Sequence, residues 1–172
     1  MRKLALHLSS AALILMGACD DDDDIDLGDL DDLDQVTFSI ALSPGQEVPV
    51  CANANASAFG AATIIVDKED GRITVETVSM GQLSSAVTAA HIHAGAFGVA
   101  GPIVFELGTD PASLSSRIFT AANYPSPPPA GAPQTFEAFV DQMLDDDTYV
   151  NIHTVNCPSG EIRGQLVVDV DD

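Results

Sequence analysis

Residues 88–107 constrain the fold more than any other stretch, because two segments of alternating side chains flank a glycine-rich loop. Successive side chains of a β-strand point to opposite faces, so His91 and His93 share one face while Ile92 lies on the other. Imidazoles at this spacing lie roughly 6 to 7 Å apart along the strand. The loop leads into another strand, 103–107, and not into a helix, which excludes a phosphate-binding glycine loop.

A second stretch, residues 149–166, has the same alternating character. Its apolar alternates, such as Val150 and Ile152, suit the buried face of a sheet, and the polar alternates then occupy the opposite face. The polar face carries Tyr149, Asn151 and His153 and, after a turn, Glu161, Arg163 and Gln165. Both stretches therefore predict strands with one apolar and one polar face.

Short segments of this kind recur along the chain, which predicts an all-β fold. The expected strands are 36–42, 61–67, 72–78, 87–93, 103–107, 116–121, 148–154 and 161–168. Asp70-Gly71 between the second and third is typical of a hairpin turn. Apolar residues at helical spacing predict one short helix over 136–144, and the proline-rich segment 124–133 is expected to be an exposed loop or a proline-rich ligand for another domain. We predict a Greek-key-like antiparallel β-sandwich or barrel with this helix in a connection.

The order of several motifs carries a family resemblance. These are Glu47-Val-Pro, His91-Ile-His, Gly101-Pro-Ile-Val, Tyr149-Val-Asn-Ile-His-Thr and Gly160-Glu-Ile-Arg-Gly-Gln-Leu. Together they resemble the CHRD domain, a module named after chordin that also occurs singly in secreted bacterial proteins. The resemblance covers about residues 36–168 and predicts one domain over 35–170. It implies a non-catalytic binding or structural module with an envelope or extracellular protein partner.

The N-terminus has the pattern of an export signal over residues 1–18, with Arg2 and Lys3 preceding a short apolar run. The run ends at Leu15-Met-Gly-Ala-Cys19, which resembles the lipobox of bacterial lipoproteins, although Met16 stands where leucine is commoner. The resemblance implies a lipid on Cys19, anchorage to the membrane and a place in the bacterial cell envelope. The alternative is an ordinary secretory signal that leaves Cys19 without lipid.

An acidic segment follows directly, since 10 of the 26 acidic residues fall between Asp20 and Asp34. Like charges in a block repel, so residues 19–34 are expected to form a disordered tether, with a calcium site as the alternative reading. An acidic run after the lipid cysteine also resembles the surface-export signals of some Gram-negative lipoproteins. From Gln35 onward the chain has 16 acidic and four basic residues and so no basic patch, which makes nucleic acid an unexpected partner.

Cys51 and Cys157 form an even pair once Cys19 is set aside for lipid. Exported proteins enter an oxidising compartment, where such a pair is favoured to bond. We therefore predict a Cys51–Cys157 disulfide.

The three histidines outside the leader, His91, His93 and His153, are the candidate site. Alternation places all three on faces opposite the apolar core, so we expect them to converge if their strands are neighbours. Imidazole suits zinc and copper, which predicts a site for one copper or zinc ion. The alternative is a purely structural network of the histidines with Glu161, Arg163, Gln165 and Asn151.

Catalysis has less support in the sequence. His91-Ile-His93 before a glycine loop looks like the copper-binding strand of copper–zinc superoxide dismutases, but three histidines are too few for that two-metal site. The chain also lacks the G-x-S-x-G elbow of serine hydrolases. A binding module is the primary prediction, and a small metalloprotein or metalloenzyme is the alternative.

Overall fold

The structure, a computed structural model, describes residues 34–168. The predicted signal segment 1–18, Cys19 and all of the predicted tether except Asp34 lie outside the described residues. Within the described part, no helix is long and apolar enough to cross a bilayer.

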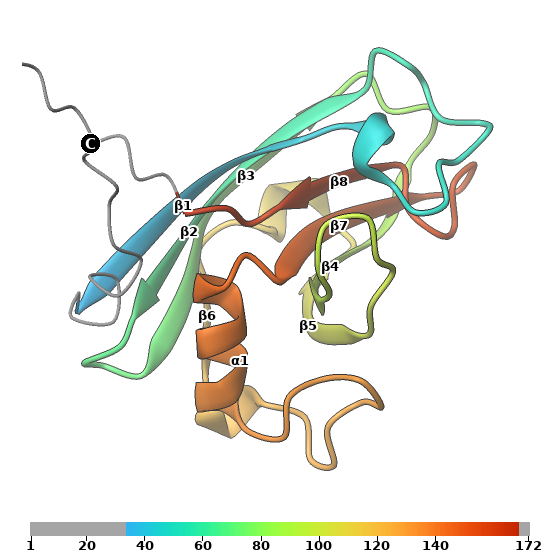
Figure 1. Cartoon of the computed structure of the whole chain (residues 1–172). Coiled ribbons are helices and arrows are strands. Elements are labelled where there is room, and N and C mark those ends of the chain that lie inside the picture. Colours follow the sequence, from blue (N-terminus) through green and yellow to red (C-terminus); the bar gives the residue numbers. More distant parts are fainter. Residues whose placement is uncertain (1–33, 169–172) are drawn as a thin grey trace, which may run out of the picture.

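In residues 34–168, eight strands form two antiparallel sheets, with one α-helix in a connection (Figure 1). The first sheet has the order β1-β2-β3-β6 and the second the order β5-β4-β7-β8. The bounds are β1 Gln35–Leu42, β2 Phe59–Asp67, β3 Arg72–Gly81, β4 Val87–Ala94, β5 Ile103–Gly108, β6 Arg117–Thr120, α1 Phe136–Leu144, β7 Thr148–Thr154 and β8 Ile162–Gln165, with short 3-10 turns at Pro44–Gln46, Pro111–Ser113 and Ala121–Asn123. The prediction of an all-β sandwich with one short helix is confirmed.

The first sheet follows the alternation of its sequence. Every second residue of β1 is buried, beginning with Val36 and Phe38, and the residues between them are exposed. The β2–β3 hairpin closes at the pair Asp67↔Arg72, and Gly71 has φ +59° in the turn, a backbone conformation that glycine adopts without strain.

The core lies between the sheets and extends under α1. Thr135 accepts a hydrogen bond from the Ala138 amide at 3.2 Å and so caps the helix N-terminus. The buried helix residue Phe139 packs edge-on against Phe105 of β5, with ring centroids 5.5 Å apart. The predicted core contact of this helix is therefore present.

The last strand is shorter than the predicted segment 161–168. β8 ends at Gln165, and the Val168 amide then donates to the Asp146 carboxylate at 2.9 Å, which draws the chain away from the sheet. At its other end β8 bonds to the chain just after β1, because Ser43 and Arg163 exchange backbone hydrogen bonds of 2.9 and 3.2 Å. This bridge connects the two sheets along one edge.

Two strands of the second sheet, β7 and β8, are buried on both faces. All seven residues of β7 and all four of β8 are buried, although only every second one is apolar. The inward residues include Val150 and Ile152, which belong to the core. The outward, polar residues are covered by loops from both directions, and this face of the sheet carries the candidate site.

Candidate metal centre

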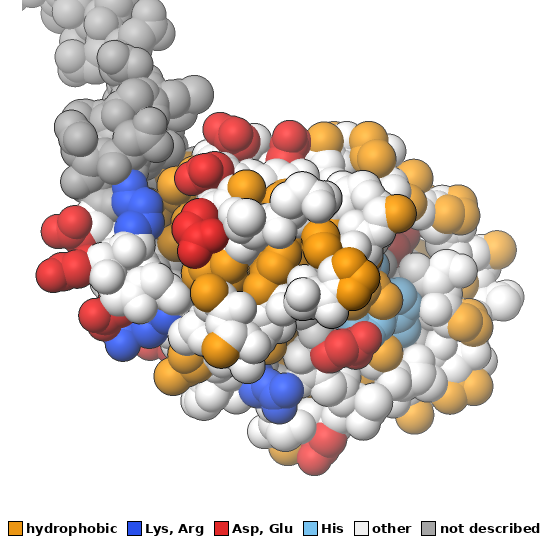
Figure 2. Space-filling view, turned by 90° about the horizontal axis from the view of Figure 1, so that it is seen from below, with side chains coloured by type: hydrophobic (Ala, Val, Ile, Leu, Met, Phe, Trp, Pro, Cys, Tyr) orange, Lys and Arg blue, Asp and Glu red, His pale blue; other side chains and the backbone are white. Residues whose placement is uncertain are grey.

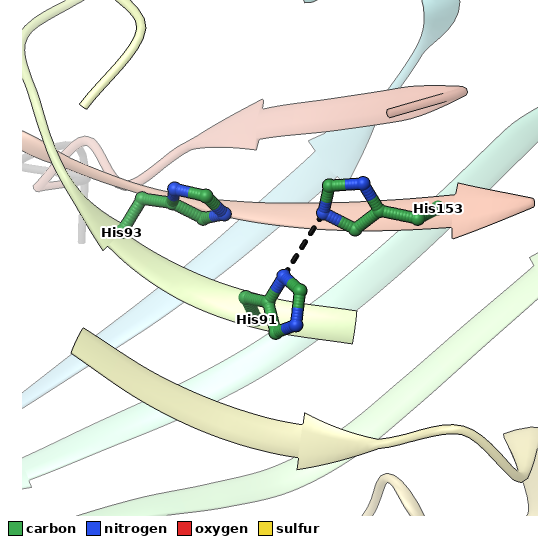
Figure 3. Close-up of side chains that lie close together, drawn as sticks. All are labelled: His91, His93 and His153. Atoms are coloured by element: carbon green, nitrogen blue, oxygen red, sulfur yellow. Dashed lines mark hydrogen bonds between the residues drawn. The ribbon is translucent and has the colours of Figure 1, made fainter. Parts of the chain in front are cut away.

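The pairing of β4 with β7 assembles the three histidines. Ala89 pairs with His153, and His91 pairs with Asn151, so His153 is the diagonal neighbour of His91 on the same outward face. One nitrogen of each of His91, His93 and His153 lies within 4.8 Å of the others (Figure 3). The convergence expected from alternation is therefore present.

All three rings are buried, with 6 to 8% of each residue exposed. Each ring also directs one nitrogen outward to a hydrogen-bond acceptor. His93 Nδ1 lies 2.9 Å from the Gly101 carbonyl, and His153 Nδ1 lies 3.0 Å from the Pro158 carbonyl. His91 Nε2 lies 2.9 Å from the Glu106 carboxylate. Because carbonyls and carboxylates only accept, these three outer nitrogens carry the ring protons.

The inner nitrogens are then left as unprotonated lone pairs when the rings are neutral. His91 Nδ1 and His153 Nε2 lie 2.9 Å apart, while the buried His93 Nε2 has no hydrogen-bond partner. Lone pairs that face one another repel, and a metal cation between them would remove this repulsion. Outer nitrogens held by carbonyls or a carboxylate are the usual arrangement of metal-binding histidines.

The surroundings keep two of the rings neutral. Burial lowers the pKa of His93 to about 4, helped by the charges of the other two histidines and Arg163, although the Gly101 carbonyl opposes the shift. Burial likewise lowers the pKa of His153. Neutral imidazole is the form that binds a metal ion, so neither ring needs to lose a proton near neutral pH.

A stack of side chains supports His93. The Tyr149 ring lies parallel to the His93 ring, with centroids 4.6 Å apart and an angle of 11° between the planes. The Arg163 guanidinium lies over the other face of Tyr149, 3.5 Å from the ring centroid. The stack therefore connects the histidine group to a buried cation.

The glycine loop 95–101 is fastened over this stack. Arg163 donates to the carbonyls of Val99 at 2.8 Å and Ala96 at 2.9 Å, and the Gly101 amide donates to the Tyr149 hydroxyl at 3.0 Å. A Cβ on Gly101 would clash with the Ala94 carbonyl oxygen, so only glycine fits there. The loop thus places the carbonyl that orients His93.

The four residues of the predicted polar network fall into separate groups. Gln165 accepts from Arg163 at 2.8 Å and donates to the Gly95 carbonyl at 3.0 Å, so these two residues hold the glycine loop. Asn151 donates to the Glu47 carboxylate at 3.3 Å. Glu161 accepts hydrogen bonds from the amides of Asn55 and Ser84 and from the hydroxyls of Ser84 and Thr154. The hydrogen bonds found for the four network residues thus lead to surrounding loops, to β7, to Glu47 and, between Arg163 and Gln165, within the set.

Glu47 is a buried residue that sequence reasoning did not place in the site. It is 4% exposed, and both of its carboxylate oxygens lie so close to Gly160 that a Cβ there would clash with them. Burial raises the pKa of Glu47 to about 7, against the opposing effects of Arg163 and Asn151. Its position in the Glu47-Val-Pro motif was the available signal, but only the folded loop reveals its neighbours.

The predicted disulfide is confirmed. Cys51 and Cys157 are bonded, with their Cα atoms 5.8 Å apart and 106 positions apart in the sequence. Cys157 directly precedes Pro158, whose carbonyl orients His153. The disulfide therefore connects the loop after Glu47 to the turn beside the histidines.

The fold and this face define a small all-β sandwich with a buried polar layer on the outside of one sheet. A family model of the CHRD domain matches residues 38–166, and the chain belongs to that family. The CHRD domain marks it as a small binding module. Comparisons with curated proteins and with solved structures gave no match.

Proposed function

We propose that this CHRD domain is a non-catalytic binding module whose ligand is one copper or zinc ion, held by His91, His93 and His153. The observation that carries the proposal is the orientation of the rings: each outer nitrogen is committed to an acceptor, and each inner nitrogen faces the other two. Two nitrogen ligands of one ion, each about 2.0 Å from it, lie roughly 3 Å apart. The separation of 2.9 Å between His91 and His153 suits such a pair.

The charge of the molecule also supports this role. Figure 2 shows a small area of histidine surface beside acidic side chains. The described part has one lysine and three arginines, and it is strongly acidic overall. An acidic surface attracts cations and raises their concentration near the histidines.

We propose further that the module is exported and tethered to the bacterial envelope by lipid on Cys19. The support is the pattern of residues 1–19 together with the Cys51–Cys157 disulfide, which suits an oxidising compartment. Two acyl chains on the terminal cysteine would anchor the protein stably.

Metal content of protein purified without an affinity tag tests the binding role. We expect about one equivalent of copper or zinc per chain after exposure to each metal, and dissociation constants weakened at least 100-fold in His91→Ala and His153→Ala, measured by competition with a chromophoric chelator. Thr148→Val is the matched control, because Thr148 lies fully buried on β7, outside the histidine group. Equal affinity in wild type and His91→Ala would leave the histidines as a structural network.

Mass spectrometry of the mature protein tests the anchor. We expect an acylated Cys19 at the N-terminus and partition into detergent, both lost in Cys19→Ser. A mature N-terminus at another residue would overturn the anchor and leave the metal proposal untouched.

A further inference from the structure

Three nitrogen donors make up the candidate centre, and no fourth donor joins them. Among residues 34–168, no carboxylate or thiol belongs to the group formed by His91, His93 and His153. Zinc in sites with three protein ligands completes a tetrahedron with water. Monovalent copper is stable with three ligands, and in a buried site it needs none from solvent. Imidazole binds both metals, so the donor atoms alone do not choose between them.

A buried positive charge stands behind one of the ligands. Arg163 is 1% exposed, and its guanidinium remains protonated at any ordinary pH. It stacks on Tyr149 at 3.5 Å, and Tyr149 stacks on His93 at 4.6 Å. This cation lies roughly 8 Å from the His93 ring along the stack, and it repels a divalent ion held by that ring about twice as strongly as a monovalent ion.

Nearby carboxylates offset this charge only in part. Glu106 bonds to His91, but its side chain is 69% exposed, so water and salt screen it. Glu47 is buried beside Arg163, and because burial raises its pKa to about 7 it is only partly ionised near neutral pH. Glu161 forms hydrogen bonds with four donors of its own.

From the donor count and the buried cation we infer that the ion is monovalent copper, and that Arg163, acting through the stack on Tyr149 and His93, determines this specificity. The inference rests on the metal-binding function proposed above and goes beyond it by naming the ion. Arg163 is a positioning and charge-setting residue, since its hydrogen bonds go to the glycine loop and to Gln165 and its charge lies behind the ligand.

Removing the charge of Arg163 should change selectivity between the two ions. The experiment measures dissociation constants for Cu(I), under anaerobic conditions with a Cu(I)-specific chelator, and for Zn(II) with a zinc-specific indicator. Wild type is expected to bind Cu(I) more tightly than Zn(II). Arg163→Met should shift the ratio about tenfold toward Zn(II), the size expected for one unit charge at this distance. Arg163→Lys retains the charge but loses the paired bonds to the loop, and it should keep the wild-type ratio.

A second variant keeps the test decisive if Arg163→Met does not fold. Glu47→Gln removes the carboxylate beside Arg163 and should move the ratio in the opposite direction, toward Cu(I), at pH 8, where Glu47 is ionised in wild type. Copper loaded into wild type as Cu(I) should also give no electron paramagnetic resonance signal after exposure to air. Tighter Zn(II) than Cu(I) binding, or a ratio that neither variant alters, overturns the inference while the metal-binding function stands. Absence of any metal binding overturns both.

Discussion

Two buried polar clusters lie beside strands of the second sheet, and they differ in how completely their hydrogen-bonding groups are satisfied. In the first, the glutamate cluster, Glu161 is fully buried and its carboxylate accepts four hydrogen bonds. The second cluster contains the three histidines together with Glu47, Asn151 and Arg163, and we call it the histidine layer. In it, several buried polar atoms have no hydrogen-bond partner. These atoms are His93 Nε2, Glu47 Oε1, Asn151 Oδ1 and Arg163 Nε. Unsatisfied buried atoms are costly, so a fold that retains them together has a use for them.

The donors of the glutamate cluster come from three segments of the chain. Ser84 donates both its amide, at 2.6 Å, and its hydroxyl, at 2.8 Å, while Thr154 donates its hydroxyl at 2.6 Å and Asn55 its amide at 3.2 Å. Burial alone raises the pKa of Glu161, but these hydrogen bonds outweigh it and hold the pKa below the usual value. The cluster is complete without a ligand, and its role is to hold loops in place.

The largest expected effect follows from breaking the complete cluster. In Glu161→Gln, an amide nitrogen replaces one acceptor oxygen and faces donors that it cannot satisfy. We expect the free energy of unfolding to fall by about 4 kcal/mol, because hydrogen bonds to a buried charge contribute roughly 1.5 to 3 kcal/mol each. Urea unfolding followed by circular dichroism measures this loss.

The exposed Glu69→Gln, in the β2–β3 turn, is the control and should change stability by less than about 0.5 kcal/mol. Metal affinity of the folded fraction should be the same in Glu161→Gln as in wild type. A variant as stable as wild type would contradict the structural role of this cluster.

The second expected effect is a change in the pH dependence of stability, and it concerns Glu47, the carboxylate of the histidine layer. Because the pKa of Glu47 in the folded protein, about 7, lies above its ordinary value of 4.5, the folded state holds this proton more tightly than the unfolded state does. Its contribution to stability is therefore fully present below about pH 4.5 and is lost as the pH rises through 7. Glu161, whose pKa is lowered, behaves in the opposite way and loses its contribution as the pH falls.

Glu47→Gln removes this titration. Relative to wild type, the variant should gain roughly 2 kcal/mol of stability between pH 5 and pH 8, in unfolding curves measured without metal. Taking the difference between the two proteins cancels the titration of the other groups. Glu69→Gln again serves as the control, and a difference that does not change with pH would refute the assignment.

Sequence reasoning predicted the faces of the strands but not their neighbours. Alternation placed His91 and His93 together, since that depends only on local backbone geometry. The pairing of Ala89 with His153, which brings the third ring to them, is a register that no local pattern specifies.

Contacts made by residues in loops were also not predictable from the sequence. Glu47 and Glu161 were both visible as acidic residues in motifs, yet their surroundings come from segments about 100 positions away, such as Asn151 for Glu47 and Asn55 for Glu161. The Cys51–Cys157 disulfide was predictable because, once Cys19 is set aside, an even pair leaves one partner for each cysteine. A buried carboxylate has no such pairing rule.

The smallest expected effect distinguishes the two clusters most sharply. In His93→Phe, the ring stacked on Tyr149 is retained, the unpartnered Nε2 is removed, and the hydrogen bond to the Gly101 carbonyl is lost. The gain from removing a buried unsatisfied atom and the loss of one hydrogen bond are of similar size, about 1 kcal/mol each. The metal-free variant should therefore unfold within about 1 kcal/mol of wild type.

Metal binding by the same variant should respond very differently. With one of three ligands gone, we expect the affinity for copper to fall at least 100-fold, measured by the same chelator competition in folded protein. A residue that only pins strands together would show the reverse pattern, with a stability loss near that of Glu161→Gln and no change in metal affinity. Stability and affinity measured together on His93→Phe and Glu161→Gln thus assign each cluster its role, because each variant is expected to alter one property and leave the other unchanged.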